Sequence, residues 1–281
     1  MLGRTFQNMQ VARKAIAAIA AAGTLAASAV ALWRRFGPST YVRIPTMFGK
    51  ARVYQVSDDE GADVRLLEVG GIVQSGTYLD ERYADLVFEY LKRYDLMFST
   101  ERRIRHVAVL GCGGYDYPEH LIAHYPEVTC DAVEIDPAIT AIARRYFHLD
   151  RIIEEYDAER SGRLNLVCAD ALDFLKTADR LYDAIVNDTF DAGKPPAHLT
   201  TLEFYRAAHD CLMPGGMFLT NIVSPLVGPD ATFLWRQVRL MELAFSHVGV
   251  YPCATDEFAD SDNVIVIASD GAIPSSDRYA G

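Results

Sequence analysis

The stretch that most constrains the fold is 107–118, VAVLGCGGYDYP. An apolar run of β type is followed by three closely spaced glycines (Gly111, Gly113 and Gly114), and Pro118 can then begin a helix. A buried strand that ends on glycines and leads into a helix presents backbone N–H groups and the positive end of the helix dipole at one edge of a sheet. Because nucleotide-like ligands bind at this edge in open α/β sheets, the stretch predicts a nucleotide- or nucleoside-binding domain.

Strand-like and helical patterns alternate after this point. The alternation predicts an α/β fold with a Rossmann-like, mostly parallel seven-stranded sheet and helices on both faces. Three β-like runs before it, at 51–57, 64–71 and 72–78, predict a small N-terminal antiparallel β-region, and a helix is predicted at 80–97. The predicted strands are 106–110, 128–135, 164–168, 182–187, 217–222, 248–251 and 263–268, and the predicted helices between them are 118–124, 138–146, 171–177, 201–212 and 231–245.

The N-terminal stretch 15–33 contains nineteen residues without a charge, and arginine or lysine flanks both ends. This length is enough for a helix that spans a bilayer, which predicts an N-terminal hydrophobic helix that associates with the membrane. A cleaved signal peptide and a loosely attached helix remain alternatives, and the flanking charges do not decide the orientation. The resulting division is a hydrophobic segment at 1–36, a linker with the β-region and a helix at 37–100, a Rossmann-like domain at 101–270 and a polar tail at 271–281.

Composition excludes some classes of function. The 281 residues carry a formal net charge of -11, so binding to nucleic acid is disfavoured, because it requires basic surface. None of the five cysteines forms a C-x-x-C pair, so we expect no metal site of that kind. Cys130 and Cys168 lie in apolar strands, where we expect both to be buried.

Acidic residues near the strand ends limit the class of ligand that this edge of the sheet could bind. Asp116 stands where the dinucleotide fingerprint has its third glycine, which argues against NAD or FAD. Glu134, 21 residues after Gly113, has the spacing of an acid that binds ribose hydroxyls, although a solvated acid at the strand end is the alternative. Asp170 follows the third strand and is predicted either to contact an adenine amine or to cap a helix. Asp188 follows the fourth strand and would lie beside the same ligand.

Taken in order, these motifs resemble the spermidine/spermine synthase (aminopropyltransferase) family, in a divergent, spermidine-synthase-like branch of the class I S-adenosylmethionine-dependent methyltransferase fold. The resemblance covers about 64–223. It is carried by VAVLGCGG, DAVEIDP, LVCADALDFL, YDAIVNDTFD and HLTTLEFYRAAHDCLMPGGMFLTN, and by LLEVGGIVQSGTYLDERYADLVFEYL upstream.

The resemblance implies transfer of an aminopropyl group from decarboxylated S-adenosylmethionine to an amine such as putrescine, without a metal. It implies that Asp188 is catalytic and that Asp191 is the second acid of a D-x-x-D motif. It also implies that Gln74 contacts the sulfonium side chain, and that the glycine loop, Glu134 and Asp170 hold the nucleoside. A homodimer and a domain that faces the cytoplasm are implied as well.

This sequence departs from the family pattern in the half of the site that would bind the amine. Gly114 stands at the position of the aspartate that the family uses for the aminopropyl amine, and Asp116 follows two residues later. Tyr83-Ala84-Asp85 is the nearest match to the family's Tyr-His-Glu, and makes Tyr83 a candidate for substrate binding. Two alternatives therefore stay open: a methyltransferase that uses intact S-adenosylmethionine on an unknown acceptor, and a non-catalytic nucleoside-binding domain at the membrane.

Overall fold

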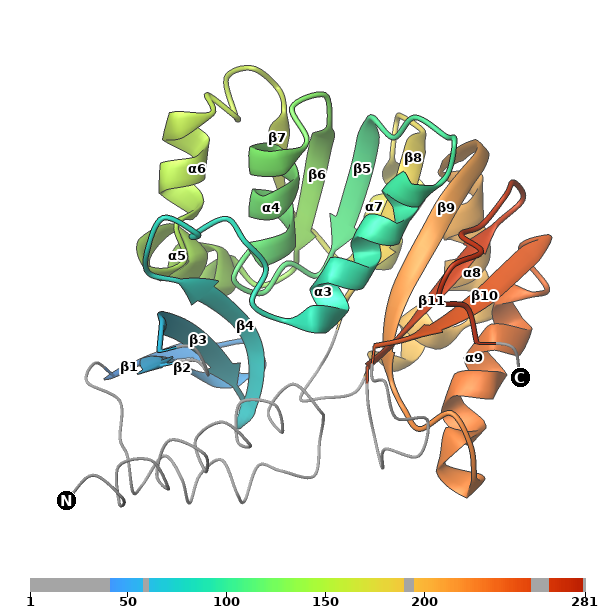
Figure 1. Cartoon of the computed structure of the whole chain (residues 1–281), viewed down its shortest axis with the longest axis horizontal. Helices are drawn as coiled ribbons and strands as arrows, with labels where there is room; N and C mark the ends of the chain where they lie inside the picture. Colours follow the sequence, from blue (N-terminus) through green and yellow to red (C-terminus); the bar gives the residue numbers. More distant parts are fainter. Residues whose placement is uncertain (1–40, 58–60, 190–194, 254–262, 280–281) are drawn as a thin grey trace.

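The computed structural model describes residues 41–57, 61–189, 195–253 and 263–279, which form two sheets with helices packed against them (Figure 1). The predicted N-terminal helix at 15–33 and the predicted site residue Asp191 lie outside these ranges. Within them, no helix combines the length and the apolar character needed to cross a bilayer.

The N-terminal sheet is the antiparallel meander that the sequence predicts, with one additional strand. Its strands are hydrogen-bonded in chain order: β1 (Tyr41–Thr46), β2 (Gly49–Ser57), β3 (Asp63–Val69) and β4 (Ile72–Tyr78). The additional strand β1 occupies part of the stretch predicted as a linker. It pairs with β2 through a tight turn at which Thr46 and Gly49 are opposite each other.

The large sheet has seven strands in the order β10-β11-β9-β8-β5-β6-β7. Only β11 is antiparallel to its neighbours, so the sheet is mostly parallel, as predicted. Its strands are β5 (His106–Leu110), β6 (Thr129–Glu134), β7 (Leu164–Cys168), β8 (Tyr182–Asn187), β9 (Leu212–Val223), β10 (His247–Pro252) and β11 (Asn263–Ser269).

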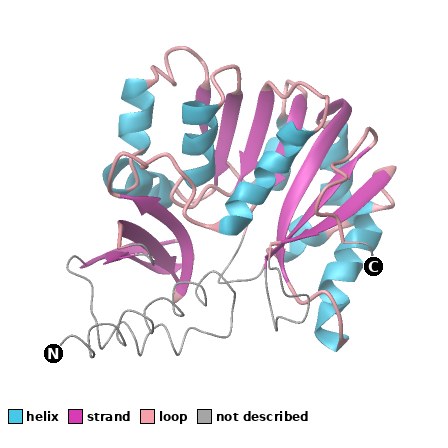
Figure 2. Ribbon diagram, in the orientation of Figure 1, coloured by secondary structure: helices cyan, strands magenta, loops and turns pink. Residues whose placement is uncertain are grey.

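Helices cover both faces of this sheet (Figure 2). The apolar side chains of β5 show why: Val107 and Val109 belong to one core cluster and Ala108 and Leu110 to the other. Since successive side chains of a strand point to opposite faces, a continuous apolar strand must be buried on both sides. The first cluster includes α3 (Glu89–Arg93), η1 (Tyr94–Ser99), α4 (Asp116–His124), α5 (Pro137–Tyr146) and α6 (Leu149–Glu155), and the second includes α7 (Ala171–Thr177), α8 (Leu202–Asp210) and α9 (Thr232–Met241).

Two sequence expectations were wrong, and one helix was missed. The helix predicted at 80–97 begins only at Glu89, and the residues up to Phe88 form turns. Side chains stabilise these turns, because the Asp80 carboxylate accepts from the backbone N–H of Arg82 and the Thr77 hydroxyl donates to the carbonyl of Tyr83. The helix α6 was not predicted at all. Cys168 is exposed rather than buried, since β7 is the edge strand of the sheet.

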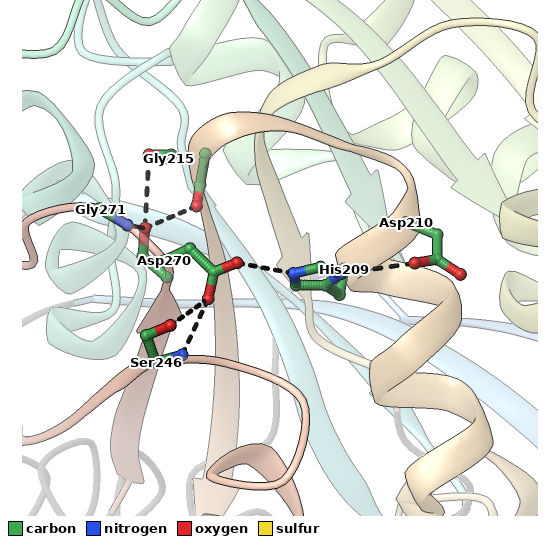
Figure 3. A network of polar contacts seen from close by, with 8 residues as sticks. His209, Asp210, Gly215, Ser246, Asp270 and Gly271 are labelled. Atoms are coloured by element: carbon green, nitrogen blue, oxygen red, sulfur yellow. Dashed lines mark hydrogen bonds and ion pairs between the residues drawn. The ribbon is translucent and has the colours of Figure 1, made fainter.

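A polar network ties the end of α8 to β10 and β11 on the outside of the molecule (Figure 3). Asp270 accepts hydrogen bonds from the backbone N–H and the hydroxyl of Ser246, at 2.8 and 2.9 Å, and its other oxygen lies 2.9 Å from His209 Nε2. The contact with Asp270 raises the pKa of His209 above its ordinary value, and the contact with His209 lowers the pKa of Asp270 to about 2. The pair should therefore stabilise the fold most when both groups are charged.

We expect Asp270→Asn to lower the melting temperature by about 1–3 °C near pH 5, since an exposed ion pair contributes less than about 1 kcal/mol. The raised pKa of His209 means that its share is present at low pH and is lost as the pH rises through that pKa. The lowered pKa of Asp270 means that its share is lost only in strong acid. Thermal melts at pH 5 and pH 8.5 should show the larger loss at pH 5. Asp210→Asn removes the longer contact of 3.4 Å to the same imidazole and should cause a smaller loss. An equal loss at both pH values in Asp270→Asn would contradict the ion pair.

Candidate active site

A cavity of about 520 Å³ opens at the carboxyl ends of the parallel strands. It lies at the point where the strand order reverses, because β6 and β7 continue from β5 on one side and β8 lies on the other. The N-terminal sheet and α3 contribute further walls through Gln74, Ser75, Tyr90 and Leu91. The cavity is therefore enclosed by both sheets and has the size of a typical small-molecule site.

The glycine loop after β5 forms the floor of the cavity beside β8. A Cβ atom on Gly111 would lie 2.6 Å from the backbone oxygen of Asp188, and Gly111 has a φ of +78°. Only glycine fits this close approach in this backbone conformation. The loop thus brings its backbone directly against the residue that follows β8.

Glu134, at the end of β6, stabilises this loop through hydrogen bonds. Its carboxylate accepts hydrogen bonds from the backbone N–H groups of Cys112, at 3.1 Å, and Asp136, at 2.9 Å. Burial raises the pKa of Glu134, while these backbone hydrogen bonds act in the opposite direction. The side chain is 7% exposed and lines the cavity, so it presents acceptor oxygens to a ligand there.

Asp170 lies after β7 and makes two kinds of contact. Its Oδ1 caps α7 by accepting from the N–H groups of Leu172 and Asp173, and its Oδ2 lies 2.8 Å from His198 Nε2. Partial burial acts to raise its pKa, but the hydrogen bonds from His198 and the backbone bring it below the ordinary value. Asp170 thus caps a helix and also lines the cavity, and its contact with an adenine amine stays a prediction.

Asp188 lies in the cavity on the opposite side of β5 from Asp170. Asn221 donates a hydrogen bond of 3.1 Å to its Oδ1. Burial raises the pKa of Asp188 to about 6, although hydrogen bonds from Asn221, Tyr90 and Tyr94 lower it. Such a carboxylate changes its protonation near neutral pH, which suits a group that accepts a proton.

Asp116 is a second buried carboxyl in the same cavity, 9% exposed, in the first turn of α4. Its Oδ2 accepts from the N–H of Gly76 in β4 at 3.0 Å. Its Oδ1 is buried and meets no donor at hydrogen-bonding geometry among the described residues. Burial, together with the charge of Asp188, raises the pKa of Asp116 to about 7, and the hydrogen bond from Gly76 and the nearby Ser75 hydroxyl act against this rise.

The space beside Gly114 is filled by its neighbours. A Cβ atom there would lie 2.8 Å from Asp116 Oδ1 and Ser75 Cβ and 2.9 Å from Phe147 Cδ1. The N–H of Gly114 donates to Ser75 Oγ at 2.6 Å. A larger residue is therefore excluded at this position, because its Cβ atom would clash with the carboxyl group of Asp116.

The structure brings most of the predicted site residues together. Those that line the cavity are Gln74, Gly111, Gly113, Asp116, Glu134, Asp170 and Asp188. Gly114 does not line it, and Asp191 lies outside the described residues. Tyr83 is held elsewhere: its hydroxyl donates to Glu155 at 2.7 Å, and the Arg151 guanidinium lies 3.5 Å from its ring centroid.

Sequence reasoning missed Tyr90, Tyr94, Asn221 and Ser75 as site residues. Tyr90 and Tyr94 are spaced as neighbours on one helix face, a pattern that usually indicates core packing. Asn221 lies within an apolar strand, where its polarity was the available signal. In the ranges that the structure describes, no group of three or more His, Cys, Asp or Glu residues is arranged to hold a metal ion.

Comparison with known proteins agrees with this geometry. A family model described as the spermine/spermidine synthase domain matches residues 88–274, which is more than half of the chain. This chain belongs to that family. The match includes the glycine loop and the acids that line the cavity from Asp116 to Asp188.

Individual relatives extend the comparison. A polyamine aminopropyltransferase from Chromobacterium violaceum is 29% identical over 168 residues, which cover 59% of this chain and 61% of the relative. A probable spermidine synthase structure from Corynebacterium glutamicum has a TM-score of 0.70 at 21% identity, covering 84% of this chain and 82% of that one. The human methyltransferase-like protein 13, solved with SAH, has a TM-score of 0.53 at 21% identity, covering 68% of this chain and 86% of that one. The fold is thus that of the class I methyltransferases.

Proposed function

We propose that this protein transfers an aminopropyl group from decarboxylated S-adenosylmethionine to a small amine such as putrescine. The proposal combines family membership with the position of the acids in the cavity. It rests most heavily on one observation, the buried carboxyl group of Asp116 beside the glycine loop.

Glu134 and Asp170 would bind the nucleoside of the donor. Glu134 offers acceptor oxygens to the ribose hydroxyls, and Asp170 offers one to the 6-amino group of adenine. Gln74 lies on β4 at the cavity wall and would contact the chain on the sulfonium. The glycine loop between them permits a close approach of the nucleoside to the backbone.

Asp188 would orient the acceptor amine and receive its proton. A primary amine, with a pKa near 10.4, is mostly protonated at neutral pH and must become neutral before it attacks. Its nitrogen then attacks the carbon next to the sulfonium, the carbon–sulfur bond breaks, and the electron pair remains on sulfur in methylthioadenosine. Asn221 and the two tyrosines hold the Asp188 carboxylate for this step.

Asp116 favours the decarboxylated donor over the intact one. The intact donor carries a carboxylate on its side chain, which would meet the carboxyl group of Asp116 as a like charge or as acceptor against acceptor. The decarboxylated donor carries only an ammonium group, which would be attracted to the Asp116 carboxylate that lines the cavity. This argument favours aminopropyl transfer over methyl transfer.

Product analysis with the two donors tests the proposal. The full chain is incubated with putrescine and with either decarboxylated or intact S-adenosylmethionine, and the nucleoside products are separated. We expect methylthioadenosine from the decarboxylated donor and no S-adenosylhomocysteine from the intact donor. Formation of S-adenosylhomocysteine would instead identify a methyltransferase, and the absence of both turnover and nucleoside binding would identify a non-catalytic domain.

The remaining parts of the proposal concern how the protein is placed in the cell. Membrane association through 15–33, a transferase domain that faces the cytoplasm and a homodimer stay predictions, as do the segment boundaries at 36, 100 and 270. A cytoplasmic orientation agrees with the proposed donor, which is an intracellular metabolite. Asp191 stays a predicted second acid for the amine.

A further inference from the structure

The adenine end of the cavity contains a histidine–aspartate pair that the proposed transfer chemistry does not require. His198 lies in the short helix η2 (Ala197–Thr200), and its Nε2 is 2.8 Å from Asp170 Oδ2. Both residues line the cavity, with Ile135, Pro196 and Leu199 beside them. Because a carboxylate can only accept, Nε2 of His198 carries the hydrogen in this contact.

Hydrogen bonds that do not involve the imidazole fix the backbone around His198. Thr201 caps α8 and its hydroxyl donates to the His198 carbonyl, at 3.0 Å. The N–H of Leu199 donates to the carbonyl of Pro196 at 3.0 Å, and the Leu199 side chain is buried. Loss of the imidazole should therefore leave this turn folded, so the side chain is available for another role.

We propose that His198 is a positioning residue that makes the site selective for a 6-amino purine over a 6-oxo purine. This inference rests on the proposed function, because it takes Asp170 as the group that meets the base. Asp170 Oδ1 is committed to the cap of α7, and His198 uses one acceptor site of Oδ2. The second acceptor site of Oδ2 accepts from a 6-amino group but opposes a 6-oxo group, which is itself an acceptor.

The imidazole also controls whether a water molecule can bridge the two acceptors, Asp170 Oδ2 and a 6-oxo group. The Asp170 side chain is 23% exposed and the His198 side chain 51%, so the pair lies at the boundary between cavity and solvent. Without the imidazole, a water molecule can occupy its place and donate to both Asp170 and a 6-oxo group. His198 excludes that water and fixes Oδ2, so its removal should reduce discrimination between the two bases.

Binding of two nucleosides to the full chain tests this role. Dissociation constants are measured for 5′-methylthioadenosine and 5′-methylthioinosine with the wild type, His198→Ala and His198→Gln. We expect His198→Ala to lower the ratio of the two affinities about tenfold, the effect of about one hydrogen bond. His198→Gln should restore most of the ratio, because its amide can donate to Asp170 and fill part of the space.

Steady-state kinetics separates positioning from catalysis. In His198→Ala the KM for the nucleoside donor should rise, while kcat at saturation stays within about twofold of the wild type. His209→Ala is the matched control, since His209 also pairs with an aspartate, Asp270, on the outside of the molecule. It should leave both the affinity ratio and the KM unchanged.

The outcomes distinguish the inference from the proposed function. Equal weakening of both nucleosides in His198→Ala, or an unchanged ratio, would overturn the role of His198 while leaving aminopropyl transfer intact. A wild type that binds neither nucleoside and forms no methylthioadenosine would overturn both.

Discussion

Asp188→Asn is expected to reduce kcat by about 10²- to 10⁴-fold, the usual effect of removing a group that accepts a proton in the rate-determining step. Asparagine keeps the shape of the side chain and an oxygen that can accept from Asn221, but it cannot take a proton from the amine. Binding of methylthioadenosine should change by less than about threefold, because Asp188 lies on the opposite side of β5 from Asp170. Turnover with putrescine and calorimetric titration with methylthioadenosine measure the two effects.

The pH dependence of the wild type provides an independent test of Asp188. Because kcat/KM reports ionisations of the free enzyme, it should fall as the pH decreases, first as Asp116 is protonated near pH 7 and then more steeply near pH 6, where Asp188, with a pKa of about 6, is protonated. The hydrogen bond from Tyr90 lowers this pKa, so Tyr90→Phe should move the acidic limb to higher pH. If the limb stays in place in Tyr90→Phe, or if Asp188→Asn loses methylthioadenosine binding, the assigned role of Asp188 is wrong.

Asp116→Asn is expected to raise the KM for decarboxylated S-adenosylmethionine by about 10- to 100-fold, because a hydrogen bond between charged groups contributes about 1.5–3 kcal/mol. The same change removes the negative charge that opposes the carboxylate of the intact donor. Competition by intact S-adenosylmethionine should therefore become stronger. Inhibition constants of the intact donor against the wild type and the variant measure this shift in preference.

Asp116→Asn should also raise the melting temperature at pH 8, by about 2–4 °C for each kcal/mol. The folded carboxyl has a pKa of about 7, well above its ordinary value, so the wild type loses stability as the pH rises from about 4 to 7. The stability gain of the variant should accordingly disappear near pH 4. A variant that loses stability at pH 8 would show that the carboxylate is structural.

Glu119 offers a matched control for this pair of effects. It lies one turn further along α4, is 2% exposed, does not line the cavity, and has a pKa raised by burial and by Asp116. Glu119→Gln should likewise raise the melting temperature at pH 8 but leave the KM for the donor within about twofold. Equal changes in KM for the two variants would show that Asp116 has no specific role in binding the donor.

Local sequence patterns predicted the large sheet and the acids that line the cavity at the ends of β6 and β7. The apolar run of β5, its glycine loop, and the acids Glu134 and Asp170 are each encoded within a few residues. Because parallel strands align their carboxyl ends at one edge, acids that follow successive strands must gather there. This rule needs no knowledge of side-chain packing.

The surroundings of Asp188 could not be predicted in this way. Tyr90 and Asn221 come from segments far apart in the sequence, and they meet Asp188 only through the packing of α3 and β9 around the cavity. Tyr83 lies apart from the cavity for the same reason, since the turns after β4 direct it to α6. The match of Tyr83 to a family motif is a match of residue type, and residue type alone does not fix the direction in which a side chain points.

The sequence alone determined that this chain forms a strand–glycine loop–helix unit with acids at the ends of its parallel strands, because backbone conformation and strand alternation are local properties. Tertiary structure decided which side chains surround the loop. Packing of β4 against α4 buries Asp116 beneath Gly76, fills the space at Gly114 with Ser75, and leaves one carboxylate oxygen without a donor. Burial and the approach of Asp188 set its pKa, and these depend on residues about 40 and 70 positions away in the sequence.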